Sequence, residues 1–265
     1  MSQQMGRLAS SWTTVHNLPM HARVSVEPAP AGCPVVVLVH GVGVSSRYMI
    51  PTAQRLGTSC RVYAPDLPGF GLSGKLAHAL TLRELSDVLA DWMQATGLDR
   101  AALLGDSFGC QVVAEFAVRH PERIEQAVLV GPTVDPQGRT FGEQARRWLI
   151  NTPYEPATQA LIVLRDYRDC GLRRAWRTFQ FCLQDHIEEK LPLVQAPTLV
   201  VRGSHDAIVP QRWAEEVTRL LPHGKLVVIP GAAHTVNSDA PLELARVALP
   251  FLWAGCTTAR REQIA

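Results

Sequence analysis

Ser107 has the type and the surroundings of a catalytic nucleophile. Residues 101–104 form an apolar run typical of a buried strand, and residues 111–120 carry apolar side chains at helical spacing. The serine therefore lies on a sharp strand-to-helix turn. Gly105 and Gly109, two positions to either side, would let the strand and the helix approach closely. This small-x-Ser-x-small pattern predicts a nucleophile elbow, which holds the hydroxyl clear of the sheet at the amino end of a helix.

A serine hydroxyl at neutral pH needs a neighbouring base, and the base needs a carboxylate that orients it and stabilises its charged form. In an open α/β sheet such residues lie at the carboxyl ends of strands. Asp206 follows the predicted strand 197–201, and His234 follows the predicted strand 225–229. Alone, they would be an ordinary turn carboxylate and an ordinary loop histidine. In the chain order Ser107, Asp206, His234, each just beyond a strand, they predict a Ser–His–Asp catalytic set.

Three other side chains compete for these roles. Asp135 follows the strand before a long insertion, and it is the alternative to Asp206 as the orienting acid. His205 is next to Asp206, but it lies in the wrong loop to act as the base. Cys110 follows the second elbow glycine and is expected to face helix packing, so a cysteine nucleophile is not expected.

The elements that must position these residues alternate between strand and helix. The predicted strands are 13–16 and 22–26 (a hairpin joined through Leu18 and Pro19), 34–39, 61–64, 101–104, 126–130, 197–201 and 225–229. The predicted helices outside the insertion are 46–56, 81–96, 111–120, 210–220 and 242–253. Such alternation implies right-handed crossovers and predicts an α/β fold: a mostly parallel central sheet with helices on both faces.

Several motifs make the chain resemble the α/β-hydrolase family over essentially its whole length. They are the loops 40–43 and 66–73, the elbow 105–109, the loops 203–210 and 231–234, and the triplet 239–241. The resemblance implies that Ser107 is the nucleophile, that His234 is the general base and then the acid, and that Asp206 orients it. It also implies an oxyanion hole made by the backbone N–H groups of Val42 and Phe108, which would stabilise a tetrahedral intermediate.

Residues 135–190 interrupt the alternation, since they contain no strand-like run and have the pattern of several helices rich in arginine and aromatic residues. This is where the family places its cap. We therefore expect an α/β-hydrolase core of residues 1–134 and 191–265 and an inserted helical cap, or lid, of residues 135–190. Some cap aromatics would line an apolar pocket, while more than half would hold the helices together. For any one arginine, an ion pair is expected more often than binding of a substrate carboxylate.

Composition excludes other classes of function. The net charge is +2, and no block of lysine and arginine with interleaved aromatics occurs, so we expect neither a nucleic acid nor a membrane as partner. The six cysteines show no metal-ligand spacing, and we expect free thiols, no metal and no organic cofactor. Neither a signal pattern nor a membrane-spanning run is present. The expectation is a cytoplasmic monomer or small homo-oligomer.

Together these features predict a serine hydrolase that cleaves small-molecule carboxylic esters, with lactones as a further class, through an acyl-enzyme. A carbon–carbon hydrolase of ring-cleavage products would use the same residues. Such relatives often have proline and an aromatic residue where this chain has Val44 and Thr235, so that alternative ranks lower. Relatives that displace halide carry aspartate in place of Ser107, so Asp106 is not expected to be a nucleophile. A ligand-binding receptor with poor turnover is the alternative outside catalysis.

Overall fold

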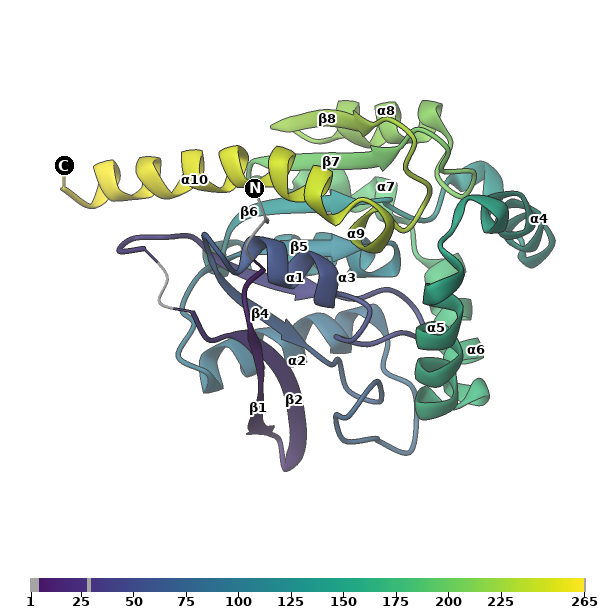
Figure 1. The fold of residues 1–265 in the computed structure, drawn as a ribbon, viewed down its shortest axis with the longest axis horizontal. Helices are drawn as coiled ribbons and strands as arrows, with labels where there is room; N and C mark the ends of the chain where they lie inside the picture. The colour runs from purple at the N-terminus through teal and green to yellow at the C-terminus, as the bar shows by residue number, and fades with distance from the viewer. Residues whose placement is uncertain (1–4, 28–29, 265) are drawn as a thin grey trace.

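The computed structural model describes residues 5–27 and 30–264, with residues 256–264 described by their backbone alone. Its centre is an eight-stranded sheet in the order β1-β2-β4-β3-β5-β6-β7-β8 (Figure 1). The strands are β1 (Leu8–Val15), β2 (Leu18–Ser25), β3 (Val35–Val39), β4 (Arg61–Pro65), β5 (Ala101–Asp106), β6 (Ile124–Val130), β7 (Thr198–Gly203) and β8 (Gly224–Ile229). Strand β2 pairs antiparallel with both β1 and β4, and the other neighbours are parallel. The predicted mostly parallel α/β sheet is confirmed.

Helices cover both faces of this sheet. They are α1 (Ile50–Leu56), α2 (Leu82–Ala95), α3 (Phe108–Arg119), α4 (Phe141–Asn151), α5 (Ala157–Cys170), α6 (Leu172–Gln184), α7 (Ile187–Lys190), α8 (Gln211–Leu220), α9 (Val236–Asp239) and α10 (Pro241–Ile264). Along β3, Val37 and Val39 pack with α2, α3 and α8, whereas Val36 and Leu38 pack with α1 and α10. The continuous apolar run of this strand is thus explained by two cores, one on each face.

The amino-terminal hairpin is tighter than predicted. Its turn is at His16 and Asn17, which have φ angles of 49° and 62°, and not at Leu18 and Pro19. A two-residue turn with two positive φ angles matches the twist of paired strands, and asparagine tolerates that conformation. Pro19 instead lies inside β2, opposite Thr14. The predicted turn was wrong because proline was taken as the turn signal.

The predicted start was correct for α2 and wrong for α1. Thr81 caps α2 and forms the predicted capping box with Glu84, so that helix begins where the sequence indicated. In contrast, α1 begins at Ile50, and the predicted start at Ser46 was wrong. The backbone N–H of Ser46 donates to the Asp66 carboxylate at 2.6 Å and is held in a turn, and Pro51 then occupies the first turn of α1.

Helices α4 to α7 lie between β6 and β7 in the chain, in the segment where helices without strands were predicted. In Figure 1, α4, α5 and α6 lie together at one side of the sheet. Asp166 of α5 accepts a hydrogen bond from Ser45 in the loop after β3, and Cys182 of α6 donates one to Gln111 of α3. These inserted helices therefore cover the edge at which the parallel strands end. No helix in the described part of the chain is long and apolar enough to cross a bilayer.

Candidate active site

Ser107 lies between the end of β5 and the start of α3, in a strained backbone conformation with φ 53° and ψ −116°. Its N–H donates to the Val130 carbonyl at 2.8 Å, which ties the turn to the neighbouring strand β6. A Cβ on Gly105 would lie 2.5 Å from the Gly109 carbonyl oxygen, and a Cβ on Gly109 would overlap the Val39 carbonyl. The two glycines therefore permit the close crossing of strands and helix that the turn needs.

The structure joins the three predicted residues in one hydrogen-bonded chain. The Ser107 Oγ lies 3.0 Å from Nε2 of His234, and Nδ1 of His234 lies 2.9 Å from Oδ2 of Asp206. Each residue follows the carboxyl end of a parallel strand, namely β5, β7 and β8. The Asp206 side chain is fully buried and that of His234 nearly so. The imidazole is thus placed to accept the serine proton on one nitrogen while the carboxylate holds the other.

Asp206 is fixed by its own loop. Its Oδ1, the oxygen not used by the imidazole, accepts the backbone N–H groups of Ile208 and Val209 at 2.9 and 2.8 Å. Its carbonyl accepts a hydrogen bond from the Arg202 guanidinium at 2.9 Å. The two N–H groups hold the carboxylate, and Arg202 holds its loop. The carboxylate therefore remains aimed at the imidazole.

The histidine loop is held by Asp239, whose carboxylate accepts the Ala233 N–H at 2.8 Å. This gives the triplet after His234 a role in loop geometry. On the other side, Gly131 has φ 57°, and a Cβ there would lie 3.0 Å from Nδ1 and Cε1 of the imidazole. Gly131 therefore leaves the space that the ring occupies. Its position directly after a strand end was the signal that sequence reasoning passed over.

The electrostatics favour a charged imidazole during reaction. Burial by itself lowers the pKa of His234, but the charge of Asp206 and its hydrogen bond outweigh this effect and raise the pKa above the ordinary 6.5. The buried charges of Asp106 and Glu155 act in the same direction. Such surroundings stabilise the protonated form of a base that takes up a proton in the transition state.

The predicted oxyanion donors are Val42, in the loop after β3, and Phe108, the residue directly after Ser107. Phe108 is the first residue of α3, so its N–H has no acceptor within the helix. Val42 follows Gly41, at which an added Cβ would lie 3.6 Å from the Ser107 Cβ. No hydrogen-bond partner is found for the Val42 N–H among the described residues. The N–H groups of Val42 and Phe108 thus remain the candidate oxyanion donors.

His40 and Asp66 hold the loops after β3 and β4 in place. The Nδ1–H of His40 donates to the Gly41 carbonyl, and its Nε2 accepts the Leu67 N–H at 3.1 Å. Burial lowers the pKa of His40, in keeping with a neutral ring that both donates and accepts. Asp66 accepts the Leu72 N–H at 2.9 Å. The loop bearing Val42 is therefore braced against the glycine-rich loop after β4.

Two competing residues have other partners. Asp135, the alternative acid, is buried against Arg147 and Arg212, at 2.8 Å from the Arg147 guanidinium, and no hydrogen bond joins it to the candidate base in the described structure. His205 stacks on Tyr154 at a ring distance of 4.9 Å. Neither belongs to the hydrogen-bonded chain.

The residues flanking the serine are also unsuited to attack. Burial raises the pKa of the Cys110 thiol well above its usual range, and the thiol donates to the carbonyls of Gly105 and Val130. Burial also raises the pKa of Asp106 to about 7, partly offset by the charge of the candidate base, and no partner is found for its Oδ1 in the described part of the chain. Asp106 is a buried neighbour of the site, placed beneath the loop that carries Gly41.

A second Ser–His–Asp chain occurs in the amino-terminal hairpin. The Ser10 Oγ lies 3.0 Å from Nε2 of His21, and Nδ1 of His21 lies 2.8 Å from Asp66. Ser10 is in the middle of β1, in regular register opposite Arg23, with neither a strained turn nor a helix amino end. Similar hydrogen-bond distances therefore occur without the surroundings that would stabilise an oxyanion.

The inserted helices add residues that sequence reasoning missed. The Asn151 side chain accepts the Ala207 N–H at 3.4 Å and donates to Glu155 at 2.5 Å. Glu155 in turn accepts the hydroxyl and the N–H of Thr235. Ala207 and Thr235 directly follow the candidate acid and the candidate base. A clamp therefore links both loops, and no local pattern predicts it because its members are far apart in the chain.

The aromatic residues of the insertion line a groove of about 400 Å³ between α4 and α6. Its walls include Phe141, Trp148 and Trp176, and the Phe141 and Trp176 rings meet edge to face at 5.4 Å. Tyr167 also lines it, and its ring lies against Gly43, so that any Cβ there would overlap it. The groove is thus separated from the loop beside Ser107 by one ring.

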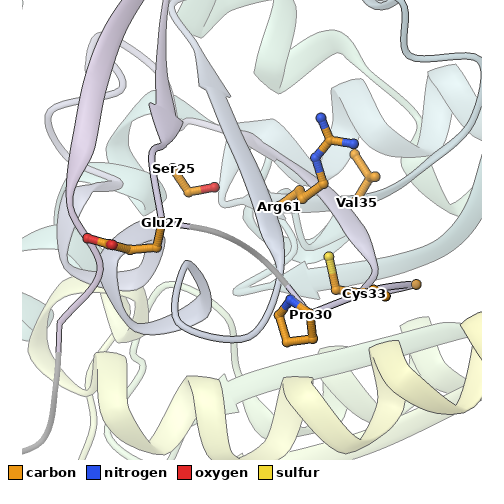
Figure 2. A pocket seen from close by; sticks show the side chains of 8 residues that line it. Ser25, Glu27, Pro30, Cys33, Val35 and Arg61 are labelled. Carbon is orange, nitrogen blue, oxygen red and sulfur yellow. The ribbon is translucent and has the colours of Figure 1, made fainter.

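A second cavity, of about 550 Å³, lies at the opposite end of the parallel strands (Figure 2). Val35 and Arg61, the first residues of β3 and β4, line it together with Glu27 and Cys33. It has no serine–histidine pair, and it is remote from the strand ends where Ser107 lies. In the described residues no group of three or more histidine, cysteine or acidic side chains could hold a metal ion.

Comparison with known proteins agrees with this architecture. A family model described as alpha/beta hydrolase fold matches residues 34–161, and one described as TAP-like protein matches residues 174–243. Carboxylesterase YbfK of Bacillus subtilis is 26% identical over 254 residues, covering 87% of this chain and 84% of its own. The 2-hydroxymuconate semialdehyde hydrolase of Pseudomonas sp. strain CF600 is 29% identical over 227 residues, covering 78% and 72%.

Among solved structures, a membrane phospholipase A described as a bacterial virulence factor has a TM-score of 0.79 at 24% identity, over 94% of this chain and 86% of its own. The sheet, its crossovers and the elbow after β5 are the features of the α/β-hydrolase fold. The chain belongs to the α/β-hydrolase fold family. Its sequence relatives support hydrolase activity as the class of reaction.

Proposed function

We propose that this protein is a serine hydrolase of carboxylic esters, including lactones, that works through an acyl-enzyme. The observation that carries the proposal is the hydrogen-bonded chain of Ser107, His234 and Asp206, with 3.0 and 2.9 Å between its partners. The strained turn at the serine supports it, because the surrounding fold must compensate a conformation that costs about 1–3 kcal/mol. The relative named carboxylesterase supports an ester over other acyl substrates.

In this mechanism the Ser107 oxygen attacks the ester carbonyl while its proton passes to Nε2 of His234. Asp206 keeps the imidazole oriented and stabilises its charge, and the N–H groups of Val42 and Phe108 hold the oxyanion. His234 then protonates the departing alcohol, which leaves an acyl group on the serine. Water, deprotonated by His234, attacks this acyl group, and His234 then returns the proton to the Ser107 oxygen as the bond to the acyl group breaks and the acid leaves. The hydrogen bonds among Ser107, His234 and Asp206 support the proton transfers in this proposal.

We propose further that residues 135–190 act as a cap on a core of residues 1–134 and 191–265. The contacts of α5 with the loop after β3 and of α6 with α3 support this division. Closing over the serine would exclude water from the reacting groups and bring aromatic surface to the substrate. The groove between α4 and α6 supports an apolar acyl or aromatic group in that substrate.

A carbon–carbon hydrolase remains the second candidate, because the 2-hydroxymuconate semialdehyde hydrolase is 29% identical over most of this chain. Thr235 argues against it. In place of an aromatic side chain after the histidine, this chain has a hydroxyl that is used to anchor Glu155.

The test is hydrolysis of a chain-length series of p-nitrophenyl esters, with a homoserine lactone and a dienoate diketone measured in parallel. We expect burst kinetics with at least one ester, and a fall in kcat of about 10⁴-fold or more in Ser107→Ala and His234→Ala. Ser10→Ala is the matched control, since it removes a serine hydroxyl that also lies 3.0 Å from a histidine nitrogen. It is expected to retain full turnover.

Each alternative has its own outcome. Undiminished hydrolysis in Ser107→Ala would exclude the serine mechanism. Turnover of the dienoate diketone with none of the esters would favour the carbon–carbon hydrolase. Stoichiometric binding of an ester without turnover would favour a receptor built on the same fold.

A further inference from the structure

The exposed side of α5 is apolar and basic. Leu161, Leu164, Arg165 and Arg168 follow one another at helical spacing, while the opposite side of the helix is buried. Leu161 and Leu164 are 73% and 70% exposed. A helix packed on a protein normally turns its apolar residues inward and its mixed charges outward. Apolar side chains on the outer stripe are therefore unexplained by packing within this chain.

Helix α6 repeats the pattern. Its exposed side carries Leu172, Arg173, Trp176 and Arg177, and Leu172 is 76% exposed. No acidic partner is found for Arg173 or Arg177 among the residues that the structure describes. The Arg177 guanidinium lies 4.8 Å from the ring of Phe181 on its own helix. These two arginines thus keep their charge open to a partner outside the chain.

Both stripes lie on the solvent-exposed sides of their helices. Helices α5 and α6 are joined at Gly171 and lie side by side (Figure 1). The inner side of α5 is tied to the core through Asp166 and Ser45, and α6 is tied to it through Arg174, which donates to the His78 carbonyl at 2.8 Å. The outer stripes of both helices consequently face away from the core. We call these two stripes together the α5–α6 face.

Positive charge is concentrated around this face. Residues 141–184 contain seven arginines and four acidic residues, so this short segment is more positive than the whole chain, whose net charge is +2. The acidic residues are Glu143, Glu155, Asp166 and Asp169. Of these, Asp169 lies 4.0 Å from Arg165 and 3.9 Å from Arg168 of the α5–α6 face. The average composition that led us to expect no membrane partner therefore hides a local basic and apolar surface.

The face also borders the groove between α4 and α6. Leu172 and Trp176 belong both to the face and to the groove between α4 and α6. Tyr167, which lines the same groove, lies against Gly43 in the loop beside the candidate nucleophile. A surface bound at this face would thus lie directly outside the groove.

We infer that the α5–α6 face docks on an anionic lipid surface. Exposed leucine and tryptophan side chains enter the headgroup region, and arginines bind lipid phosphates, which they contact bidentately. Such a helix pair lies in the plane of the interface and requires no helix that spans the bilayer. The attraction of several arginines to anionic lipid adds to the burial of apolar area, and neither alone gives stable binding.

Charge argues against a second copy of the chain as the occupant. A two-fold contact through the α5–α6 face would bring the same patch together from both copies, with arginines opposite arginines. The one acidic residue beside the face, Asp169, already pairs with Arg47, Arg165 and Arg168 of its own chain. A partner that covers it must instead supply negative charge together with an apolar layer, which an anionic bilayer does.

The experiment is co-sedimentation of the whole protein with vesicles of phosphatidylcholine, with and without about one third phosphatidylglycerol. We expect binding to the anionic vesicles only, with a loss of about tenfold between about 0.1 and 0.5 M salt because screening weakens the arginine contacts. Ser107→Ala is expected to bind as the unchanged protein does. Docking can therefore hold or fail independently of the proposed hydrolysis.

Two variants locate the surface. The first is the double variant Leu161→Ser with Leu164→Ser, which removes apolar contact. The second is the double variant Arg173→Gln with Arg177→Gln, which removes charge. Each is expected to lower vesicle binding at least about fivefold. Trp12→Ser and Arg83→Gln, exposed on β1 and α2, are the matched controls and are expected to bind normally. Activity on a soluble ester reports that the Leu161 and Leu164 variant is folded.

Three outcomes would overturn the inference. The first is absence of sedimentation with anionic vesicles. The second is equal binding to vesicles with and without phosphatidylglycerol. The third is a dimer in sedimentation velocity that dissociates in the Leu161 and Leu164 variant, since this would identify the occupant as a second copy.

Discussion

Hydrogen-bond distances alone do not separate the candidate active site from a structural cluster. Ser107 and Ser10 both lie 3.0 Å from a histidine nitrogen, and in both cases a buried carboxylate holds the other nitrogen. The difference is the backbone. Ser107 is on a strained turn at the amino end of α3, whereas Ser10 is on a regular strand. At the level of residues, the surroundings that can stabilise negative charge decide which serine reacts.

Asp106 gives a prediction at the same scale. Burial raises its pKa from 3.8 to about 7, so between these values the folded protein keeps a proton that the unfolded chain has released. Stability is therefore lost as pH rises through this window. Since each pKa unit corresponds to about 1.4 kcal/mol, the loss is on the order of 4 kcal/mol. Asp106→Asn has no such proton, and we expect its melting temperature to exceed that of the unchanged protein near pH 8.

The measurement is thermal unfolding of both proteins between about pH 5 and 8. The difference in melting temperature should grow with pH in favour of Asp106→Asn. Parallel curves at all pH values would mean that Asp106 is already ionised in the folded protein. Gln111→Asn, a buried amide on α3 that also lies close to the elbow, controls for a general change of packing.

At the scale of elements, the clamp formed by Asn151, Glu155 and Thr235 links the inserted segment to the loops that carry the candidate base and the candidate acid. In the proposed mechanism Glu155 is a positioning residue, since it binds Thr235 in the loop of the base directly and reaches the loop of the acid through Asn151. The carboxylates that face His234 are those of Asp206, Asp106, Glu155 and Asp239. Removal of one negative charge lowers the pKa of the imidazole.

We therefore predict that Glu155→Gln moves the acidic limb of the kcat/KM profile to lower pH. The base must be neutral to accept the serine proton, and activity is lost as pH falls through its pKa, which Glu155 helps to raise above 6.5. We also expect a fall in kcat of about tenfold from looser positioning. Glu143→Gln, in an inserted helix but with arginine partners only, should leave the limb in place. A lower kcat with an unmoved limb would make the role of Glu155 purely structural.

The sequence predicted the strands and the three candidate residues better than the connections between them. Buried parallel strands are continuous apolar runs, and their ends meet at one edge, so Ser107, Asp206 and His234 could be placed without knowing any contact. The start of α1 was wrong because a hydrogen bond from Ser46 to a distant carboxylate holds the turn. The clamp on Glu155 was invisible for the same reason, since contacts across the chain leave no periodic signal.

At the scale of the whole molecule, Asp135 ties three parts together. It follows β6, and its buried carboxylate binds Arg147 of α4 and Arg212 of α8. Arg147 also donates to the Ile208 carbonyl in the loop of the candidate acid. The residue first considered as an alternative acid thus joins the inserted helices to the sheet and its flanking helix. Because Asp135 and Arg147 are buried, removing Arg147 leaves the Asp135 carboxylate with only the half-exposed Arg212 as its ion-pair partner.

Arg147→Ala is therefore expected to destabilise the protein by about 3 kcal/mol, equivalent to a fall in melting temperature on the order of 8 °C. Arg146→Ala is the matched control. It is the preceding residue and binds the same Glu143, but its side chain is 60% exposed, against 6% for Arg147, so we expect a change below about 1 kcal/mol. Thermal unfolding followed by circular dichroism should show one transition in both variants, shifted in Arg147→Ala. Two separated transitions in Arg147→Ala would mean that the inserted helices and the core unfold independently, and equal shifts would mean that Asp135 does not join them.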